Sequence, residues 1–83
     1  MDLHEIAARF LSAALSGISA TRISELESSL RTDEVRWILQ LLTSKKLIEV
    51  GESSTYWTTA EGVKFLDIRF NMERMLRVQN SMV

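Results

Sequence analysis

Between residues 32 and 50, the pattern of apolar and polar positions predicts a helix followed directly by a β-strand. Apolar residues recur at i, i+3, i+4 and i+7, which places them on one helical face: Val35, Ile38, Leu39 and Leu42. We expect Thr32 to be the N-cap, because two acidic residues follow it where the helix dipole favours negative charge. Lys45 and Lys46 lie at the other end, where the dipole favours positive charge.

The strand over residues 47–50 is predicted to be the first half of a β-hairpin. Residues 51–54 combine glycine and serine and indicate a turn, and residues 55–58 have the composition of a returning strand. Residues 18–20 read as a short extended link, and they are a candidate third strand beside this hairpin.

Two helices are predicted before the central one. The first covers residues 2–16 and stops at Gly17, with these apolar residues on one face: Leu3, Ile6, Ala7, Phe10 and Ala14. The second covers residues 22–28, with Thr21 as its expected N-cap and both Ile23 and Leu26 facing inward. The chain from residue 21 to residue 46 is therefore expected to form a helix-turn-helix unit.

A long last helix is predicted from Thr59, its expected N-cap, to about Gln79, and it carries two apolar stripes. We assign the first stripe, Val63, Leu66 and Phe70, to packing within the chain. The second stripe alternates in steps of three and four, as in a heptad seam, and we assign it to a second copy of the chain. The expected dimer interface consists of Phe65, Ile68, Met72, Met75, Leu76, Gln79 and Met82.

Length and charge indicate a single small globular domain. The 83 residues are 46% hydrophobic, with ten basic and eleven acidic residues and a net charge of −1. No apolar run is long enough for a membrane span and no signal peptide is evident, so we expect a cytoplasmic protein. DNA-binding domains usually carry a basic surplus, so this charge argues mildly against DNA unless charges are segregated locally.

Candidate chemistry for catalysis is sparse. The chain has no cysteine and a single histidine, His4, which we interpret as a partly exposed helix residue. It also lacks a glycine-rich phosphate loop, a metal-spaced cluster and a nucleophile–base pair. We therefore expect no enzymatic activity, no catalytic residues, no metal and no cofactor.

Two motifs resemble those of a known protein family. The first is Leu39-Gln40-Leu41-Leu42-Thr43-Ser44-Lys45-Lys46-Leu47-Ile48-Glu49, and the second is Tyr56-Trp57-Thr58-Thr59-Ala60-Glu61-Gly62, followed by the long last helix. Over residues 6–80 the chain resembles the small archaeal winged-helix proteins, which include ten-kilodalton archaeal chromatin-type DNA-binding proteins. The resemblance implies an α+β fold, mainly helical with a small β-hairpin. It also implies a winged helix-turn-helix domain over residues 1–58 and, over residues 59–83, a continuous helix that dimerises as an antiparallel coiled coil.

Three positions depart from the family's pattern. Lys46 stands where the family usually has the glycine that ends the recognition helix, and Thr58 replaces a leucine in the second strand of the hairpin. The third is Asp33, on the outer face of the central helix, where the family tends to have basic or neutral polar residues. That face also carries Arg36, Trp37, Gln40 and Ser44.

In the DNA-binding interpretation, the central helix enters the major groove of double-stranded DNA. Arg36 and Gln40 are the candidates for base edges, while Trp37 packs on a sugar or a thymine methyl group. Arginines and hydroxyls near the helix starts hold phosphates, and the wing offers only hydroxyls and amides. The expected DNA-binding residues are Thr21, Arg22, Arg31, Thr32, Arg36, Trp37, Gln40, Ser53 and Ser54. The expected function is that of a dimeric transcriptional regulator or chromatin-associated factor.

The alternative interpretation is a protein-interaction module that does not bind DNA. Trp37 and Leu41 would then form a small apolar patch with a mixed-charge rim, as in a protein hot spot. Two plainer possibilities stay open. Trp37 could pack against the wing or Tyr56 as a core residue, and Arg36 could simply pair with Asp33.

Overall fold

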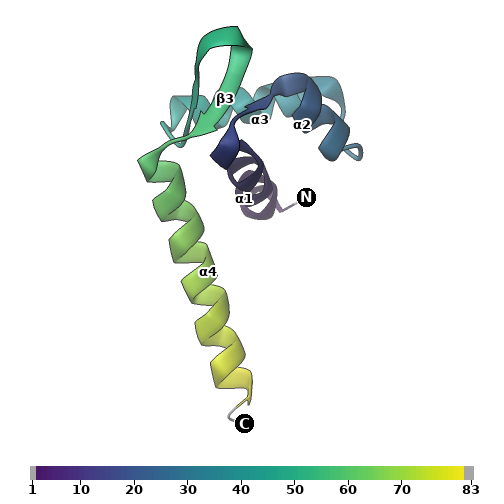
Figure 1. The fold of residues 1–83 in the computed structure, drawn as a ribbon. Helices are drawn as coiled ribbons and strands as arrows, with labels where there is room; N and C mark the ends of the chain where they lie inside the picture. Colours follow the sequence, from purple (N-terminus) through teal and green to yellow (C-terminus); the bar gives the residue numbers. More distant parts are fainter. Residues whose placement is uncertain (1, 82–83) are drawn as a thin grey trace.

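A computed structural model describes the backbone of residues 2–81 and the side chains of residues 2–69, 71 and 72. Four helices and three strands follow in the order α1 (Leu3–Ala13), β1 (Ile18–Ser19), α2 (Ala20–Leu26), α3 (Thr32–Ser44), β2 (Ile48–Val50), β3 (Thr55–Thr58) and α4 (Ala60–Ser81). Short 3₁₀ turns, η1 (Ala14–Ser16) and η2 (Glu52–Ser54), complete the elements. Figure 1 shows α4 extending away from the other elements, which are gathered at one end. The expected class, mainly helical with a small sheet, is confirmed.

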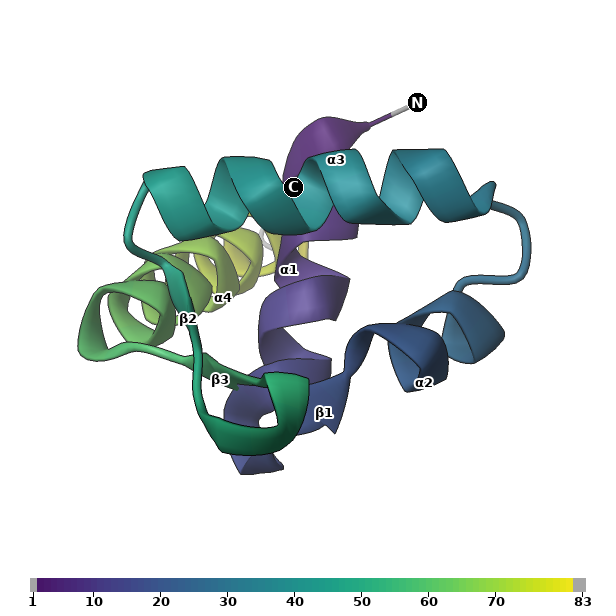
Figure 2. The same ribbon diagram turned by 90° about the horizontal axis from the view of Figure 1, so that it is seen from above.

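The core lies between α1, α2, α3 and the sheet. All four residues of the predicted α3 face are buried. From the predicted face of the first helix, Leu3 is exposed and the other four residues are buried, together with Leu11. Figure 2 shows α2 beside the N-terminal half of α3, while β2 lies next to the C-terminal end of α3 and β1 next to α2. The buried residues are Ile6, Ala7, Phe10, Leu11, Ala14, Ile23, Val35, Ile38, Leu39, Leu42 and Ile48.

The predicted hairpin and the candidate third strand form one antiparallel sheet in the order β1-β3-β2. Tyr56 pairs with Ile18 on one side and with Val50 on the other. The segment around residue 18 is thus a real strand, although only two residues long. Thr58 donates a hydrogen bond of 2.5 Å to the carbonyl oxygen of Leu11 near the end of α1. Its hydroxyl therefore links β3 directly to the last turn of α1.

Two expected helix caps are wrong by one or two residues. α2 begins at Ala20, because Ser19 in extended backbone accepts a hydrogen bond from the amide of Arg22 at 3.2 Å. Thr21 therefore lies inside the helix. In α3, Thr32 is the first helical residue, and the Glu34 carboxylate accepts from the backbone N–H of Arg31 at 2.9 Å. A carboxylate from the first turn thus caps this end in place of the expected hydroxyl.

Two other helix predictions also change. Leu26, which was expected to face inward, is exposed, because α2 ends there and turns toward the surface. The first helix is α-helical only to Ala13 and then tightens into η1, which is followed by Gly17 with φ of +85°.

Glu27, just beyond α2, accepts a hydrogen bond of 2.8 Å from Arg9 on α1, and this bond raises the pKa of Arg9.

The junction between α3 and β2 is a Schellman motif. Lys46 takes a left-handed conformation with φ of +61°, a position that glycine most often occupies at the end of a helix. The amide of Lys46 donates to the carbonyl of Thr43, and the amide of Leu47 donates to that of Leu42, each at 3.0 Å. The helix therefore ends with its last carbonyls satisfied, despite the non-glycine residue.

Thr59 and Gly62 attach α4 to this junction. Thr59 caps α4 as predicted, since its hydroxyl accepts from the amide of Gly62 at 3.1 Å. The same hydroxyl donates to the carbonyl of Lys46 at 2.7 Å. Gly62 lies against the carbonyl oxygen of Leu47 and against Thr58, so closely that a Cβ atom would overlap both. The start of α4 is thereby held against the end of α3.

The first half of α4 packs on the chain's own core. Of the residues expected in the dimer seam, Phe65 therefore contacts its own chain, while Ile68 and Met72 stay exposed. Phe65 packs with Leu66 against the core, and its ring stacks on the exposed His4 at a centroid distance of 6.2 Å. The assignment of Phe65 to a second copy therefore competes with this contact. Ile68 and Met72 are 61% and 59% exposed. The side chains of Phe70, Met75, Leu76 and Gln79, and all of Met82, lie outside the described residues.

None of the helices between residues 2 and 81 combines the length and apolar character that a bilayer crossing requires.

Candidate nucleic-acid interface

The outer face of α3 is open to solvent, opposite its buried face. It consists of Asp33, Arg36, Trp37, Gln40 and Ser44, which are all exposed as predicted. Trp37 is 55% exposed, so the possibility that it is a core residue is wrong. Leu41, its expected apolar neighbour, is only half-buried. The face therefore presents one large aromatic ring among polar side chains.

Two of the arginines expected to bind phosphates already have carboxylate partners. Arg22 pairs with Glu25 at 2.9 Å, one turn along α2. Arg31 pairs with Asp33 at 3.2 Å and approaches Glu34 at 3.7 Å. These pairs are solvent-exposed, and such pairs contribute only about 0–1 kcal/mol, so an approaching phosphate could replace either carboxylate. While these ion pairs are intact, they reduce the positive charge that Arg22 and Arg31 present to a partner.

Arg36 is different, because the expected pair with Asp33 does not form. Asp33 is held by Arg31 instead. Within the part of the chain that the structure describes, the ion pairs include neither Arg36 nor the two lysines at the end of α3. Gln40, one turn from Arg36, likewise makes no side-chain hydrogen bond there. Arg36 and Gln40 are therefore free to bind an external group.

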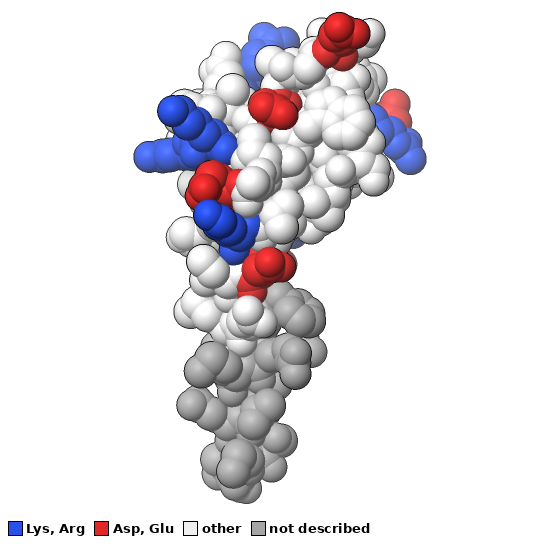
Figure 3. Space-filling view, turned by 60° about the vertical axis from the view of Figure 1, so that its left-hand side comes forward, with Lys and Arg blue, Asp and Glu red and all other residues white. Residues whose placement is uncertain are grey.

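The charge on the surface is mixed. Figure 3 shows Lys and Arg side chains interspersed with Asp and Glu on the face that it presents, without a continuous basic area. This agrees with the net charge of −1. Binding to a polyanion would consequently rest on a few local cations, and we expect it to be modest in strength.

The tip of the hairpin is a tight turn. The amide of Thr55 donates to the carbonyl of Glu52, and the two residues between them, Ser53 and Ser54, have φ of 59° and 55°. Positive φ at both central positions defines a type I′ turn, which asparagine and glycine usually occupy. Both serines are exposed, as their expected role requires, and no lysine or arginine accompanies them.

A pocket of about 220 Å³ lies between α2, α3 and β3. It brings together three predicted site residues and two that sequence reasoning missed. Thr21, Thr32 and Arg36 were predicted, while Ser24 and Tyr56 were not. Ser24 follows Thr21 by three residues, so helical spacing could have indicated it. Tyr56 could not be found this way, because the pairing of β1 with β3 places it there.

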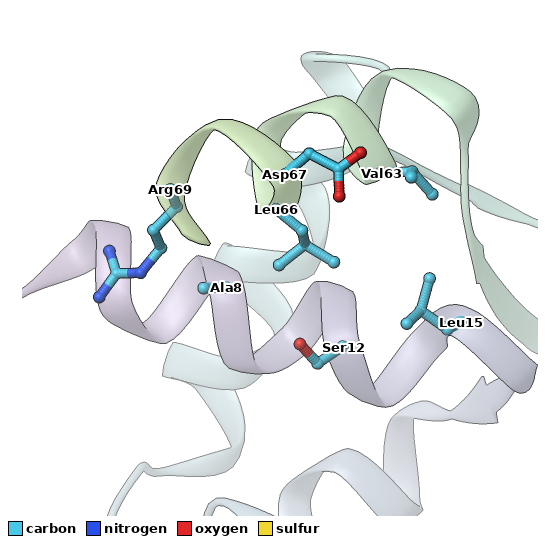
Figure 4. A pocket seen from close by; sticks show the side chains of 7 residues that line it. All are labelled: Ala8, Ser12, Leu15, Val63, Leu66, Asp67 and Arg69. Atoms are coloured by element: carbon cyan, nitrogen blue, oxygen red, sulfur yellow. The ribbon is translucent and has the colours of Figure 1, made fainter. Parts of the chain in front are cut away.

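A second, more apolar pocket of about 400 Å³ lies between α1 and α4 (Figure 4). Leu15 and Val63 lie near one end, and Arg69 reaches along α1 at the other. The Val63 and Leu66 stripe was expected to pack within the chain. Leu66 does pack against the core, while Val63 borders this hollow and remains partly open. Within the described residues, no group of three or more His, Cys, Asp or Glu is placed to hold a metal ion.

The site therefore has three parts: the outer face of α3, the pocket beside it, and the hairpin tip. Comparison with known protein families, with curated proteins and with solved structures gives no match to this chain. Its function must accordingly be inferred from the chemistry of these residues.

Proposed function

We propose that this chain is a winged-helix DNA-binding protein, which works as a homodimer in transcriptional regulation or chromatin organisation. In this proposal, α2 and α3 are the helix-turn-helix, α3 is the recognition helix, and the β2–β3 hairpin is the wing. The observation that carries the proposal is the exposed outer face of α3, where the side chains of Arg36 and Gln40 have no hydrogen-bond or ion-pair partner in the part of the chain that the structure describes. Arginine and glutamine are suited to guanine and adenine edges in the major groove.

The dimer part of the proposal rests on α4. Its exposed Ile68 and Met72 lie one turn apart, beyond the residues that pack on the core. Large apolar side chains at this spacing on one helix favour pairing with another helix. Two recognition helices would then contact half-sites separated by about 34 Å, one turn of DNA, or by a multiple of it.

The test is fluorescence anisotropy of a labelled mixed-sequence duplex, titrated with the protein at low and then moderate salt. We expect binding that weakens steeply as salt rises, because phosphate neutralisation releases counterions. Arg36→Ala should weaken binding by about tenfold, the loss that one base-reading arginine contributes.

Lys64→Ala is the matched control, because it removes one cation from α4, where Lys64 pairs with Glu61 outside the α3 face. It should leave the affinity within about twofold. If a folded dimer fails to bind at low salt, or if both variants lose affinity equally, the proposal is wrong.

A protein-interaction module is the second candidate, and the 55% exposure of Trp37 favours it. Exposed tryptophan with arginine nearby is the commonest composition of an interface hot spot. Trp37→Ala separates the two functions. A module that binds only protein would show no DNA binding in either form of the chain, and its partner capture would depend on Trp37.

A further inference from the structure

The pocket between α2, α3 and β3 has an unusual lining for its size. Four hydroxyl-bearing residues, Thr21, Ser24, Thr32 and Tyr56, surround it together with the guanidinium-bearing Arg36. Val35 and Leu39, both buried, contribute the apolar part of the lining. The pocket therefore combines several neutral hydrogen-bond donors, one permanent positive charge and an apolar base.

These donors are not used within the chain. In the described residues, none of the four hydroxyls makes a hydrogen bond. By contrast, the hydroxyls of Thr43 and Ser44, later in α3, both donate to backbone carbonyls at 2.7 Å. The lining hydroxyls can therefore turn toward a ligand without breaking a bond.

Among the described residues that line the pocket, Arg36 is also the only charged one. The acidic residues nearest to the lining residues in sequence are held elsewhere. Glu25 pairs with Arg22, and both Asp33 and Glu34 are held by Arg31. The uncompensated charge at the pocket is consequently positive, and a ligand that matches it must be an anion with acceptor oxygens on several sides.

We propose that this pocket binds a phosphate group. Phosphate has acceptor oxygens in all directions, which suits hydroxyl donors from three elements, and its charge suits a guanidinium. The apolar base would accommodate the carbons of a sugar attached to the phosphate. The group could belong to the DNA backbone or to a free phosphorylated molecule. Only the first source rests on the proposed function, and Arg36 would then contact the DNA backbone and leave Gln40 as the residue for a base edge.

The first experiment uses inorganic phosphate and the full chain without DNA, so it does not depend on DNA binding. Amide shifts are followed by NMR as phosphate replaces chloride at constant ionic strength. We expect saturable shifts confined to residues 20–24, 32–36 and 56. Arg36→Gln should weaken binding by about tenfold, because it removes a charged hydrogen bond.

Lys45→Gln is the matched control, since it removes a cation directly after α3 that has no carboxylate partner among the described residues and does not line the pocket. It should leave the phosphate affinity unchanged. Thr32→Val keeps the shape of the side chain and removes only its hydroxyl, so a loss of affinity in this folded variant would support the assigned ligand contact. Amide shifts that do not saturate would overturn the phosphate site. An equal loss of phosphate affinity in the Lys45 and Arg36 variants would also overturn it.

The second experiment adds the duplex and compares phosphate with chloride at the same ionic strength. Displacement of DNA by phosphate would identify the DNA backbone as the natural occupant. Saturable phosphate binding without displacement, or in a chain that does not bind DNA, would identify a free phosphorylated molecule instead. DNA binding without any phosphate binding would leave the proposed function standing and refute the pocket's role.

Discussion

At the scale of single residues, backbone strain at Lys46 gives a direct test of the α3 terminus. A left-handed conformation is unfavourable for residues with a Cβ atom, and Lys46 has φ of +61°. We expect Lys46→Gly to raise the free energy of unfolding by about 1 kcal/mol, measured by urea denaturation.

Lys45→Gly provides the control, because it removes the same charge from a neighbouring residue whose φ is −86°. There glycine relieves no strain and adds flexibility to the unfolded chain, so the variant should be less stable than the wild type. Equal effects of the two variants would contradict the strain at Lys46.

At the scale of elements, Gly62 sets how closely α4 approaches the end of α3. Alanine is intrinsically better than glycine in a helix by about 1 kcal/mol. An alanine Cβ here would, however, overlap the carbonyl of Leu47 and lie 2.6 Å from Thr58 Cγ2. Since backbone cannot yield as a flexible side chain can, we expect Gly62→Ala to lower stability by about 1–3 kcal/mol in thermal unfolding.

Asn71→Ala, at an exposed position of the same helix, shows the effect of helix propensity alone. That variant should be as stable as the wild type or slightly more so. A stabilised Gly62→Ala variant would mean that α4 does not pack closely on the α3–β2 junction.

At the scale of the whole molecule, the open question is what covers the exposed side of α4. The molecule measures 49 Å along its longest axis and only 27 and 20 Å along the others. If Ile68 lies in a dimer seam, Ile68→Glu buries a charge there. We expect it to shift the protein from dimer to monomer in sedimentation analysis while its circular dichroism still shows a helical fold.

Ser28→Glu introduces the same charge at an exposed position between α2 and α3, and its dimer should persist. An Ile68→Glu protein that sediments as an unchanged dimer would exclude the seam. Phe65 is a poor residue for this test, because its ring already contacts His4 and the core of its own chain.

Local pattern alone was sufficient for much of this fold. The buried face of α3, the strand limits at Thr55–Thr58 and the cap at Thr59 all follow from residues a few positions apart. Helical and strand periodicities act over this range, so neighbouring residues determine them. The exposure of the outer α3 face follows from the same periodicity.

Contacts between distant segments decided the rest. Ser19 rather than Thr21 caps α2, because pairing of β1 with β3 holds Ser19 in extended backbone next to the helix. The ion pair of Arg9 with Glu27, which joins α1 to the end of α2, is likewise a contact between residues far apart in the sequence.

The pocket required three elements that sequence does not place together, with Tyr56 brought in by the sheet. Short-range periodicity was thus enough to predict most of the elements and the faces that they bury. Which hydroxyls gather around Arg36 in one pocket followed from the tertiary fold, because contacts between segments distant in the sequence bring α2, α3 and β3 together.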